Sequence, residues 1–407
     1  MPGPLAGIRV LDLTRVLAGP WAAQNLADLG AEVIKIERPK KGDDSRAFGP
    51  PWLTDAQGRD TGESAYFACA NRGKKSLTLD LSHPQGQAIA RELAARCDVL
   101  LENFKYGDLD RYGLGYAQLK EVNPRLIYCS VTGFGHTGPW RERPGYDFMI
   151  QGMGGLMSIT GERDDRPGGG PQKAGIPIAD LITGMYASIA VCAAIAHRAK
   201  SGTGQHLDLA LLDSLVAVLA NQGANYLATG EAPARLGNDH PNIAPYQAFS
   251  TSDGSLILAC GNDNLFRKFC DVAGCGALAD DARFATNAKR VANRAELTRI
   301  LSGIMLKRGT REWLAALEAA GVPCGPINDL AQVFREPQAL ARGLKMEVPH
   351  PGVGTVSLVR SPMRFSETPV QHDVPPPLLG QHTDEVLRGL LGKNEGEVAR
   401  LRSEGII

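Results

Sequence analysis

The first 210 residues alternate between short apolar runs and longer segments with helical periodicity. Apolar runs with the length of buried strands lie at residues 8–13, 31–37, 76–81, 98–102, 126–131 and 205–210. Apolar positions spaced three and four residues apart predict helices at 21–29, 84–96 and 181–199. Strands that alternate with helices form β-α-β units and a parallel sheet. The pattern therefore predicts an α/β fold.

The second half of the chain has a different pattern. An apolar helix is predicted over 211–229, and proline, glycine and asparagine then accumulate through 230–245, as at a domain boundary. Residues 246–259 predict a hairpin with Asp253 and Gly254 in its turn. The remaining predictions are amphipathic helices at 262–320, a helical segment at 327–348, a hairpin at 349–366 and a final helix at about 382–392. We therefore expect a second, smaller α/β domain.

Composition excludes several classes of partner. The 407 residues are enough for two or three domains, and 44 basic and 44 acidic residues give no formal net charge. Because there is no global positive field, neither nucleic acid nor a membrane surface is expected as a partner. The apolar stretch 181–196 contains Thr183, Gly184 and Ser188, so it is short and weakly apolar for a membrane span. It predicts a buried, closely packed helix.

The cysteines indicate a compartment. All eight are scattered, mostly in apolar contexts, and none forms a Cys-x-x-Cys or a paired metal-ligand spacing. Reduced thiols of this kind are typical of the cytosol. The N-terminus has no charged-then-apolar leader, and residues 8–13 already predict a strand. We therefore expect a cytoplasmic protein without a metal site.

The first β-α-β unit invites comparison with dinucleotide sites. Such a site needs Gly-x-Gly-x-x-Gly in its first turn, and residues 14–20 contain only Gly19. Glu37 does end the second strand, where a ribose-binding acid is found. One of these two features is missing, so the sequence does not favour a dinucleotide.

Polar and glycine-rich segments follow several predicted strands. Ligands of open parallel sheets bind outside the carboxyl ends of the strands. The candidates for one such crevice are Arg38, Asn103, Phe104 and Arg111. The loop 132–139 has glycines for close backbone approach and contains His136, which is either a base or polar surface. The glycine-rich stretch 145–170 is either a flexible connection or a source of backbone N–H groups for an oxyanion.

Asp180 stands between the Gly/Pro-broken segment 173–179 and the long small-residue helix. This position predicts the N-cap of the helix. An N-cap carboxylate is close to the positive helix end, which favours the ionised form and leaves a bare carboxylate in apolar surroundings. Such a group can act as a nucleophile. The alternative is that Asp180 only caps the helix.

Motifs along nearly the whole chain carry a resemblance to a known family. They are Ile8–Pro20 with Ala31–Arg38, Glu102–Phe104 with Asp110-Arg111, Gly133–Pro139, Ile178–Asp180, Gly321–Pro326 and Leu378–Asp384. In this order they resemble the class III CoA-transferases, the superfamily of formyl-CoA transferase and carnitine CoA-transferase. Four stretches look especially like succinyl-CoA:glutarate (dicarboxylate) CoA-transferases: Arg15–Pro20, Gly155–Gly161, Ala244–Phe249 and Pro375–Thr383.

The resemblance implies covalent catalysis by Asp180. This residue would form an anhydride and then an aspartyl-CoA thioester as CoA passes from an acyl-CoA, succinyl-CoA by the nearest resemblance, to a free carboxylic acid. No metal or permanently bound cofactor is implied, because coenzyme A is substrate and product. The residues implied to line the CoA channel are Val16, Leu17, Ala18, Arg38, Leu79, Asn103, Phe104, Arg111, Tyr146 and Asp147. Arg38 and Arg111 suit phosphates as charged donors.

The resemblance also implies an architecture. It consists of a Rossmann-like large domain with a parallel sheet, a smaller α/β domain, and two chains threaded through each other as an interlocked-ring homodimer. The expected boundaries are a large domain at 1–200 completed by the C-terminal helix at about 380–407, a linker helix at 201–230, a small domain at 231–326 and a return linker at 327–379.

Two departures from formyl-CoA transferases concern the acceptor. Those enzymes have a glutamine where this chain has Leu17, and a run of glycines where this chain has 261–264, Gly-Asn-Asp-Asn. We therefore expect a four- to six-carbon dicarboxylate such as glutarate rather than oxalate. Arg15, Arg46 and His136 are candidates for binding its remote carboxylate.

Two other functions stay open at this point. The 2-methylacyl-CoA racemases of the same superfamily move a proton between two bases. Their signature is Gly-His-Asp where this chain has Gly145, Tyr146 and Asp147, so an expected base is absent. A non-catalytic CoA-binding or scaffold protein would keep the crevice without the chemistry.

Overall fold

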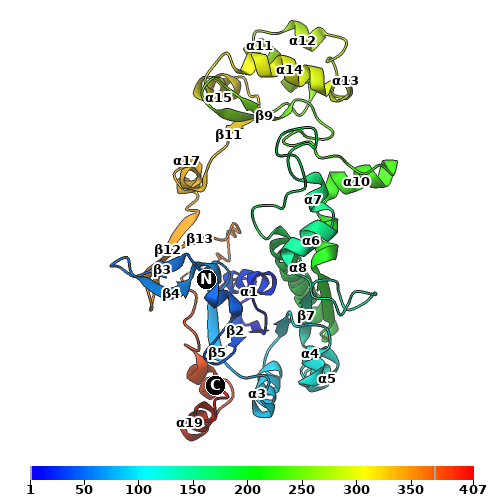
Figure 1. Ribbon diagram of the computed structural model, residues 1–407. Coiled ribbons are helices and arrows are strands. Elements are labelled where there is room, and N and C mark those ends of the chain that lie inside the picture. The colour runs from blue at the N-terminus through cyan, green and yellow to red at the C-terminus, as the bar shows by residue number, and fades with distance from the viewer. Residues whose placement is uncertain (1, 371–372) are drawn as a thin grey trace. The chain divides into compact units, whose positions relative to one another are not determined.

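The computed structural model describes residues 2–370 and 373–407, which divide into two compact units (Figure 1). The first unit contains the chain up to Gly155, Ala174–Leu219, and the chain from Pro337 onwards. The second contains Leu156–Lys173 and Ala220–Glu336. The first unit is therefore assembled from three separate segments. The domain boundaries expected from the sequence stay a prediction.

A six-stranded parallel sheet forms the centre of the first unit, in the order β5-β2-β1-β6-β7-β8. The strands are β1 (Arg9–Asp12), β2 (Glu32–Glu37), β5 (Lys74–Thr78), β6 (Val99–Glu102), β7 (Ile127–Thr132) and β8 (His206–Ala210). The predicted α/β fold with a parallel sheet is confirmed, although β5 begins two residues before the predicted run. Because β2 and β6 flank β1 on opposite sides, the strand order reverses between β1 and β6. Such a switch point is where open parallel sheets bind ligands.

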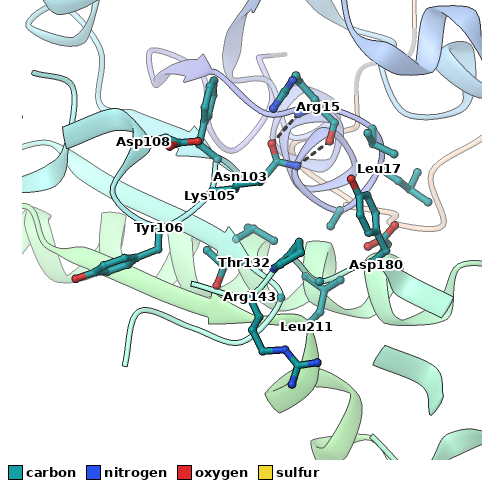
Figure 2. Close-up of a pocket in the computed structure, with 18 of the residues that line it drawn as sticks. Arg15, Leu17, Asn103, Lys105, Tyr106, Asp108, Thr132, Arg143, Asp180 and Leu211 are labelled. Carbon is teal, nitrogen blue, oxygen red and sulfur yellow. Dashed lines mark hydrogen bonds between the residues drawn. The ribbon is translucent and has the colours of Figure 1, made fainter. Parts of the chain in front are cut away.

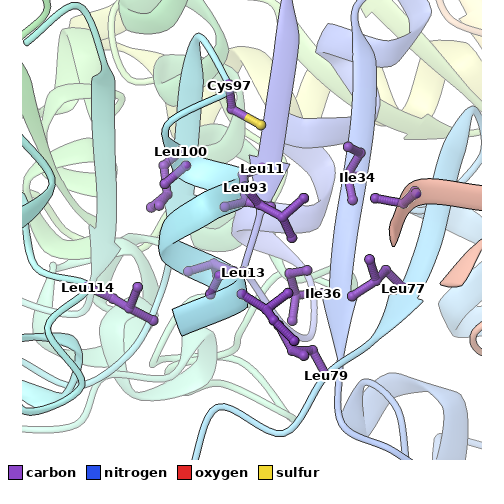
Figure 3. Packing of buried hydrophobic residues seen from close by; sticks show 14 of the residues in the cluster. Leu11, Leu13, Ile34, Ile36, Leu77, Leu79, Leu93, Cys97, Leu100 and Leu114 are labelled. Carbon is purple, nitrogen blue, oxygen red and sulfur yellow. The ribbon is translucent and has the colours of Figure 1, made fainter. Parts of the chain in front are cut away.

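Aliphatic side chains of neighbouring strands make the core of this unit (Figure 3). Leu11, Ile34, Leu77 and Leu100 are almost completely buried and gather with Leu93 of helix α3 (Pro84–Ala94). Strands of a parallel sheet are covered on both faces, so their sequences are nearly continuous apolar runs. This burial is why the periodicity located all six strands.

The C-terminal segment folds back onto the same core. It forms two helices, α18 (Thr383–Gly389) and α19 (Glu395–Ser403), where the sequence predicts one final helix at about 382–392. A capping box starts α19: Glu397 N donates to Asn394 Oδ1 over 3.0 Å, and Asn394 N donates to Glu397 Oε2 over 2.8 Å. The apolar side chains that both helices bury in the core are Val386, Leu387, Val398 and Leu401.

Helix α8 (Ile178–Ser201) packs against helix α1 (Ala18–Asp28) through small residues. A Cβ atom at Gly184 would lie 2.5 Å from the carbonyl oxygen of Ala18, so the two helices approach more closely than a side chain permits. The predicted close packing of this segment is therefore confirmed, but the predicted burial is only partial, because Met185, Tyr186 and Ile189 are exposed. In the described part of the chain, α8 is also the one helix with the length and hydropathy of a membrane span, a test that core helices of soluble proteins pass as well.

The second unit contains an antiparallel sheet in the order β11-β10-β9. Its strands are β9 (Tyr246–Ser250), β10 (Ser255–Ala259) and β11 (Cys324–Pro326), so the predicted hairpin is confirmed. The predicted group of helices is α11 (Asp263–Val272), α12 (Ala277–Asp280), α13 (Asn287–Ala292), α14 (Arg294–Met305) and α15 (Thr310–Ala319). Phe266, Phe269 and Trp313 are completely or almost completely buried in the core of this unit.

Two predicted helical segments are wrong in part. Residues 211–229 form two helices, α9 (Leu211–Ala217) and α10 (Ala220–Thr229), because Ala220 has a left-handed backbone (φ 46°) that interrupts a right-handed helix. Residues 327–348 begin with α16 (Leu330–Val333) and α17 (Pro337–Ala341), but Lys345–His350 is strand β12, paired with β13 (Gly354–Val359). Burial in β12 alternates residue by residue, which is the period of a strand.

Several short elements are absent from the sequence prediction. They are η1 (Asp44–Ala47), β3 (Trp52–Thr54), β4 (Asp60–Ser64), α2 (Ala65–Cys69), α4 (Asp108–Arg111), α5 (Tyr116–Val122), α6 (Asp147–Met153) and α7 (Leu156–Ile159). Most of them connect the strands of the parallel sheet. Four of them, η1, α2, α4 and α6, supply side chains to the site described next or to its surroundings.

Candidate active site

A pocket of about 280 Å³ lies at the switch point between β1 and β6 (Figure 2). Its walls come from the loops after β1, β6 and β7 and from the first residues of α1, α8 and α9. The predicted nucleophile and the predicted CoA-channel residues that line it are Val16, Leu17, Ala18, Asn103, Phe104, Tyr146 and Asp180. The fold therefore brings the predicted nucleophile together with six of the predicted CoA-channel residues.

The loop after β1 is held in an unusual conformation by side chains from β2 and from the loops after β2 and β6. Val16 has φ 71°, a left-handed backbone that costs a β-branched residue about 1–3 kcal/mol. Asn103 clamps the preceding residue, accepting from Arg15 N over 2.9 Å and donating to Arg15 O over 2.8 Å (Figure 2). Asp43 accepts from Val16 N over 3.1 Å, and Lys35 donates to Thr14 O over 2.7 Å. These contacts keep Leu17 and Ala18 in the pocket wall.

Buried ion pairs support this loop from within the sheet. Lys35 Nζ lies 2.8 Å from Asp43 Oδ2, and Lys74 Nζ lies 3.0 Å from Asp12 Oδ2, with all four side chains fully buried. Burial opposes the ionised form of Asp43, but the Lys35 ammonium and the N–H of Val16 overcome it and lower the pKa of this carboxyl. Removing one partner of a buried pair typically lowers the free energy of unfolding by about 3–5 kcal/mol. The two ion pairs therefore oppose any rearrangement of the residues that hold this loop.

Asp180 is not the N-cap of α8, and the sequence prediction on this point is wrong. The helix begins at Ile178 after Pro177, which provides no side-chain cap, and Asp180 is the third helical residue. The cap comes from α6 instead: Asp147 Oδ1 accepts from Ala179 N over 2.8 Å and from Asp180 N over 3.4 Å. The carboxyl group of Asp180 is therefore free of a capping role.

The surroundings of Asp180 favour its neutral form, opposite to the expectation of a cap. Burial and the nearby Asp147 carboxylate raise the pKa of Asp180 to about 7. Within residues 2–370 and 373–407, the carboxyl group of Asp180 takes part in no hydrogen bond or ion pair. It is half-buried and lines the pocket. The prediction of a bare carboxylate is thus confirmed, but the prediction that it is held ionised is wrong.

Tyr66 of α2 is a neighbour of Asp180 that the sequence did not indicate. Burial, followed by the charge of Asp180, raises the pKa of Tyr66 to about 12, so the phenol is neutral near pH 7. Tyr66 lies in a short helix after the unpredicted hairpin β3–β4 and belongs to no recognised motif. Sequence reasoning therefore had no local signal for it.

The remaining predicted CoA-channel residues occupy different positions. Arg38 and Leu79 line a second pocket of about 340 Å³ next to the ends of β2 and β5, and the two pockets share Arg15, Phe104 and Asp108. Arg111 is largely exposed and forms an ion pair with Asp108. Asp147 lines neither pocket. Contacts of all these residues with CoA stay a prediction.

The three candidates for a remote carboxylate differ in their availability. Arg15 lines both pockets and lies 3.4 Å from Asp44. Arg46 is engaged by both carboxylate oxygens of Glu37, at 2.7 and 2.8 Å, and lines neither pocket. His136 also lines neither pocket; its ring packs edge-on against Tyr106. Only Arg15 is therefore placed at the walls of the site.

Comparison with known proteins identifies the class. The sequence profile of CoA-transferase family III matches residues 5–383, and the chain belongs to this family of CoA-transferases. Among its relatives, the succinate–glutarate CoA-transferase of Agrobacterium fabrum (strain C58) is 51% identical over 387 residues, which are 95% of this chain and 96% of the relative. The human succinyl-CoA:glutarate CoA-transferase is 44% identical over 404 residues, 99% of this chain and 90% of the relative.

A more distant relative and a solved structure agree with this assignment. The acetyl-CoA:oxalate CoA-transferase of Acetobacter aceti is 39% identical over 373 residues, 92% of each chain. The crystal structure of a CAIB/BAIF family protein from Brucella suis superposes with a TM-score of 0.83 at 51% identity, covering 96% of this chain and 100% of that chain. The resemblance inferred from sequence motifs is therefore confirmed, and the protein is an enzyme that transfers CoA.

Proposed function

We propose that this enzyme transfers CoA from succinyl-CoA to glutarate or another four- to six-carbon dicarboxylate, with Asp180 as the covalent carrier. The observation that carries the proposal is the unpartnered carboxyl group of Asp180 in the wall of the pocket. The names of the relatives at 51% and 44% identity support the choice of donor and acceptor.

The first half-reaction removes the acyl group from CoA. An oxygen of ionised Asp180 attacks the thioester carbonyl of succinyl-CoA; the carbon–sulfur bond breaks and CoA leaves as a thiolate, giving a mixed anhydride. The thiolate then attacks the Asp180 carbonyl of the anhydride. This step releases succinate and leaves an aspartyl-CoA thioester. Because CoA enters and leaves as part of the substrates and products, the reaction requires no permanently bound cofactor.

The second half-reaction repeats these steps in reverse. A carboxylate of glutarate attacks the aspartyl thioester, the thiolate leaves, and it returns to the glutaryl carbonyl to give glutaryl-CoA and ionised Asp180. Negative charge develops on a carbonyl oxygen at each attack. The N–H groups of Leu17 and Ala18 have no acceptor among the described residues and belong to the same pocket wall, so they are suited to stabilise that charge.

The pocket wall favours a longer acceptor. Leu17, 3% exposed, stands where formyl-CoA transferases have an amide that can bind a short, highly charged acid. An apolar wall accommodates methylene groups instead. Arg15, which lines the pocket, is our candidate for binding the remote carboxylate of the acceptor. We therefore expect glutarate to be a better acceptor than oxalate.

The quaternary structure belongs to the same proposal. Met185, Tyr186 and Ile189 form an apolar stripe on α8, with 39–62% of each side chain exposed. A second copy of the chain, threaded through the first as interlocked rings, would bury this stripe. We also place the enzyme in the cytoplasm, which suits its eight unpaired cysteines.

The test combines one substitution with an acceptor screen. Asp180→Ala should retain CoA binding but lose transfer, because the covalent carrier is removed while the nucleotide contacts stay. Wild-type enzyme with succinyl-CoA should give a higher kcat/KM for glutarate than for oxalate. Transfer by Asp180→Ala at the wild-type rate would disprove the carrier. Exchange of an α-proton with deuterated solvent in the absence of any acceptor acid would indicate racemase chemistry instead.

A further inference from the structure

The first turn of α8 depends on a side chain from another helix. Helices need acceptors for their first N–H groups, and Pro177 at the N-cap position supplies none from its side chain. Asp147, the first residue of α6, accepts from Ala179 N over 2.8 Å and from Asp180 N over 3.4 Å with the same oxygen, Oδ1. The backbone of the nucleophile is therefore bound directly to Asp147.

Asp147 is itself fixed by a buried amide. Gln151, one turn further along α6 and completely buried, donates from Nε2 to Asp147 Oδ2 over 2.6 Å. Its Oε1 accepts from Ala174 N over 2.8 Å, and Nε2 also lies 3.4 Å from Ile176 O. Gln151 thus connects α6 with the segment that leads into α8. A connected network of this kind orders both segments together.

We infer that Asp147 is a positioning residue for the reaction, which orients the first turn of α8 and with it the carboxyl group of Asp180. The inference rests on the proposed role of Asp180. Because the Asp180 carboxyl group has no side-chain partner in the described residues, its position is set by its own backbone. Small displacements of a reacting group are costly in rate.

The position of Asp147 separates this role from a direct contact with CoA. The family resemblance implies that Asp147 lines the CoA channel, yet it lines neither of the two pockets. Both of its carboxylate oxygens are already occupied by donors of the protein. A carboxylate would also repel the phosphates of CoA. The geometry therefore favours orientation of Asp180 over binding of the substrate.

The second carboxylate has an electrostatic consequence that an experiment can follow. After burial, the charge of Asp147 is the other cause of the raised pKa of Asp180. The charge of Asp180 also contributes, after burial, to the raised pKa of Tyr66 in α2, so this phenol is neutral near pH 7. The other charged residues that line the pocket are Arg15, Asp44, Lys105, Asp108, Arg141, Glu142 and Arg143. Removing the charge of Asp147 should thus lower the pKa of Asp180.

The experiment compares Asp147→Asn and Asp147→Ala with a matched control. Asn394→Ala removes a capping side chain of the same kind from α19, far along the chain in the same unit. For each variant, kcat and KM for succinyl-CoA are measured between about pH 5 and pH 9, CoA affinity is measured by calorimetry, and folding is checked by thermal melting. Asp147→Asn keeps one oxygen acceptor for α8 and removes the charge; it also replaces the acceptor of Gln151 Nε2 by an amide N–H, and thermal melting measures the cost of that lost hydrogen bond.

The expected results differ among the variants. The acid limb of kcat/KM reports ionisation of Asp180 in the free enzyme, and Asp147→Asn should move it down by about one pH unit. Asp147→Ala should in addition lower kcat by about 10- to 100-fold while the Kd for CoA stays unchanged. Asn394→Ala should lower the melting temperature and leave both kinetic parameters and the acid limb as in the wild type.

Three outcomes would overturn the inference. The first is an acid limb that stays in place in Asp147→Asn. The second is a variant in which the Kd for CoA rises by about tenfold while kcat is kept, which would make Asp147 a CoA ligand. The third is a shift of the acid limb in Asn394→Ala equal to that in Asp147→Asn. If Asp180→Ala abolishes transfer and any of these results is found, only the positioning role fails; if Asp180→Ala still transfers CoA, the proposed function fails first.

Discussion

Gly184→Ala should disturb the wall of the active site from behind. Gly184 lies one helical turn after Asp180, at the place where α8 packs against α1. A Cβ atom there would lie 2.5 Å from Ala18 O and 3.1 Å from Trp21 Cβ. The nearer atom belongs to the backbone and cannot rotate away. The start of α1, which carries Ala18 into the pocket, must therefore move by about 1 Å to restore ordinary contact.

Two opposing effects decide the change in stability. Alanine has a higher helix propensity than glycine by about 1 kcal/mol, but overpacking a close contact typically costs about 1–3 kcal/mol. Because the clash involves backbone, we expect the cost to win and the free energy of unfolding to fall by about 1–2 kcal/mol. A displacement of about 1 Å beside Asp180, the proposed nucleophile, should also reduce kcat/KM by up to about 100-fold.

A matched control separates the clash from the propensity. Gly303 lies exposed in α14, and a Cβ atom there would meet nothing within 4 Å. Gly303→Ala should therefore stabilise the protein by about 0.5–1 kcal/mol and leave activity unchanged. Urea unfolding and steady-state kinetics measure both variants. If Gly184→Ala is as stable and as active as Gly303→Ala, the close approach of α1 and α8 has no part in shaping the site.

Two further predictions concern a buried acid and the assembly. Burial raises the pKa of Glu102 to about 7, above its value in the unfolded chain. The contribution of Glu102 to the free energy of unfolding is therefore greatest at low pH, where the group is protonated in both states, and it is lost as the pH rises through about 7. Glu102→Gln should therefore exceed the wild type in stability by up to about 3 kcal/mol at pH 8, with no gain below about pH 4.5, as measured by melting across this range; a gain that does not depend on pH would contradict the assignment. In solution, light scattering should give the mass of two chains, and Ile189→Asp on the apolar stripe of α8 should reduce it; a wild-type monomer would refute the proposed dimer.

Hydrophobic patterns in the sequence predicted the strands whose burial depends on their own residues. The strands of the parallel sheet are buried on both faces, so a strand such as Val99–Glu102 is buried at every position and is recognisable as a mostly apolar run in the sequence. The same holds for the hairpin of β9 and β10, where the turn residues mark the reversal. Two of the family motifs, Glu102–Phe104 and Gly133–Pro139, lie where strands β6 and β7 of this sheet end.

The site could not be derived to the same depth, because its decisive contacts are long-range. The cap of α8 comes from Asp147, 33 residues before Asp180, so no pattern next to the helix distinguishes a capping Asp180 from a free one. The family resemblance implies that Asn103 contacts CoA, and in the structure both ends of its amide bind the backbone of Arg15, 88 residues away in sequence. The sequence indicates that such residues belong to the site, but only the fold shows which atoms each side chain contacts.

The polar contacts around the pocket fix backbone atoms and leave the carboxyl group of Asp180 without a hydrogen bond from the described residues. The loop that carries Leu17 and Ala18 is fixed by Asn103, Asp43 and Lys35, and the first turn of α8 is fixed by Asp147. These contacts act on backbone atoms. A hydrogen bond or a cation at the carboxyl group of Asp180 would fix it as well, but it would stabilise the ionised form and weaken the attack on a thioester. For the proposed role of Asp180 as covalent carrier, orientation through the backbone leaves its oxygens free to form and break bonds, and the raised pKa makes the carboxylate, once formed, a more basic and therefore stronger nucleophile.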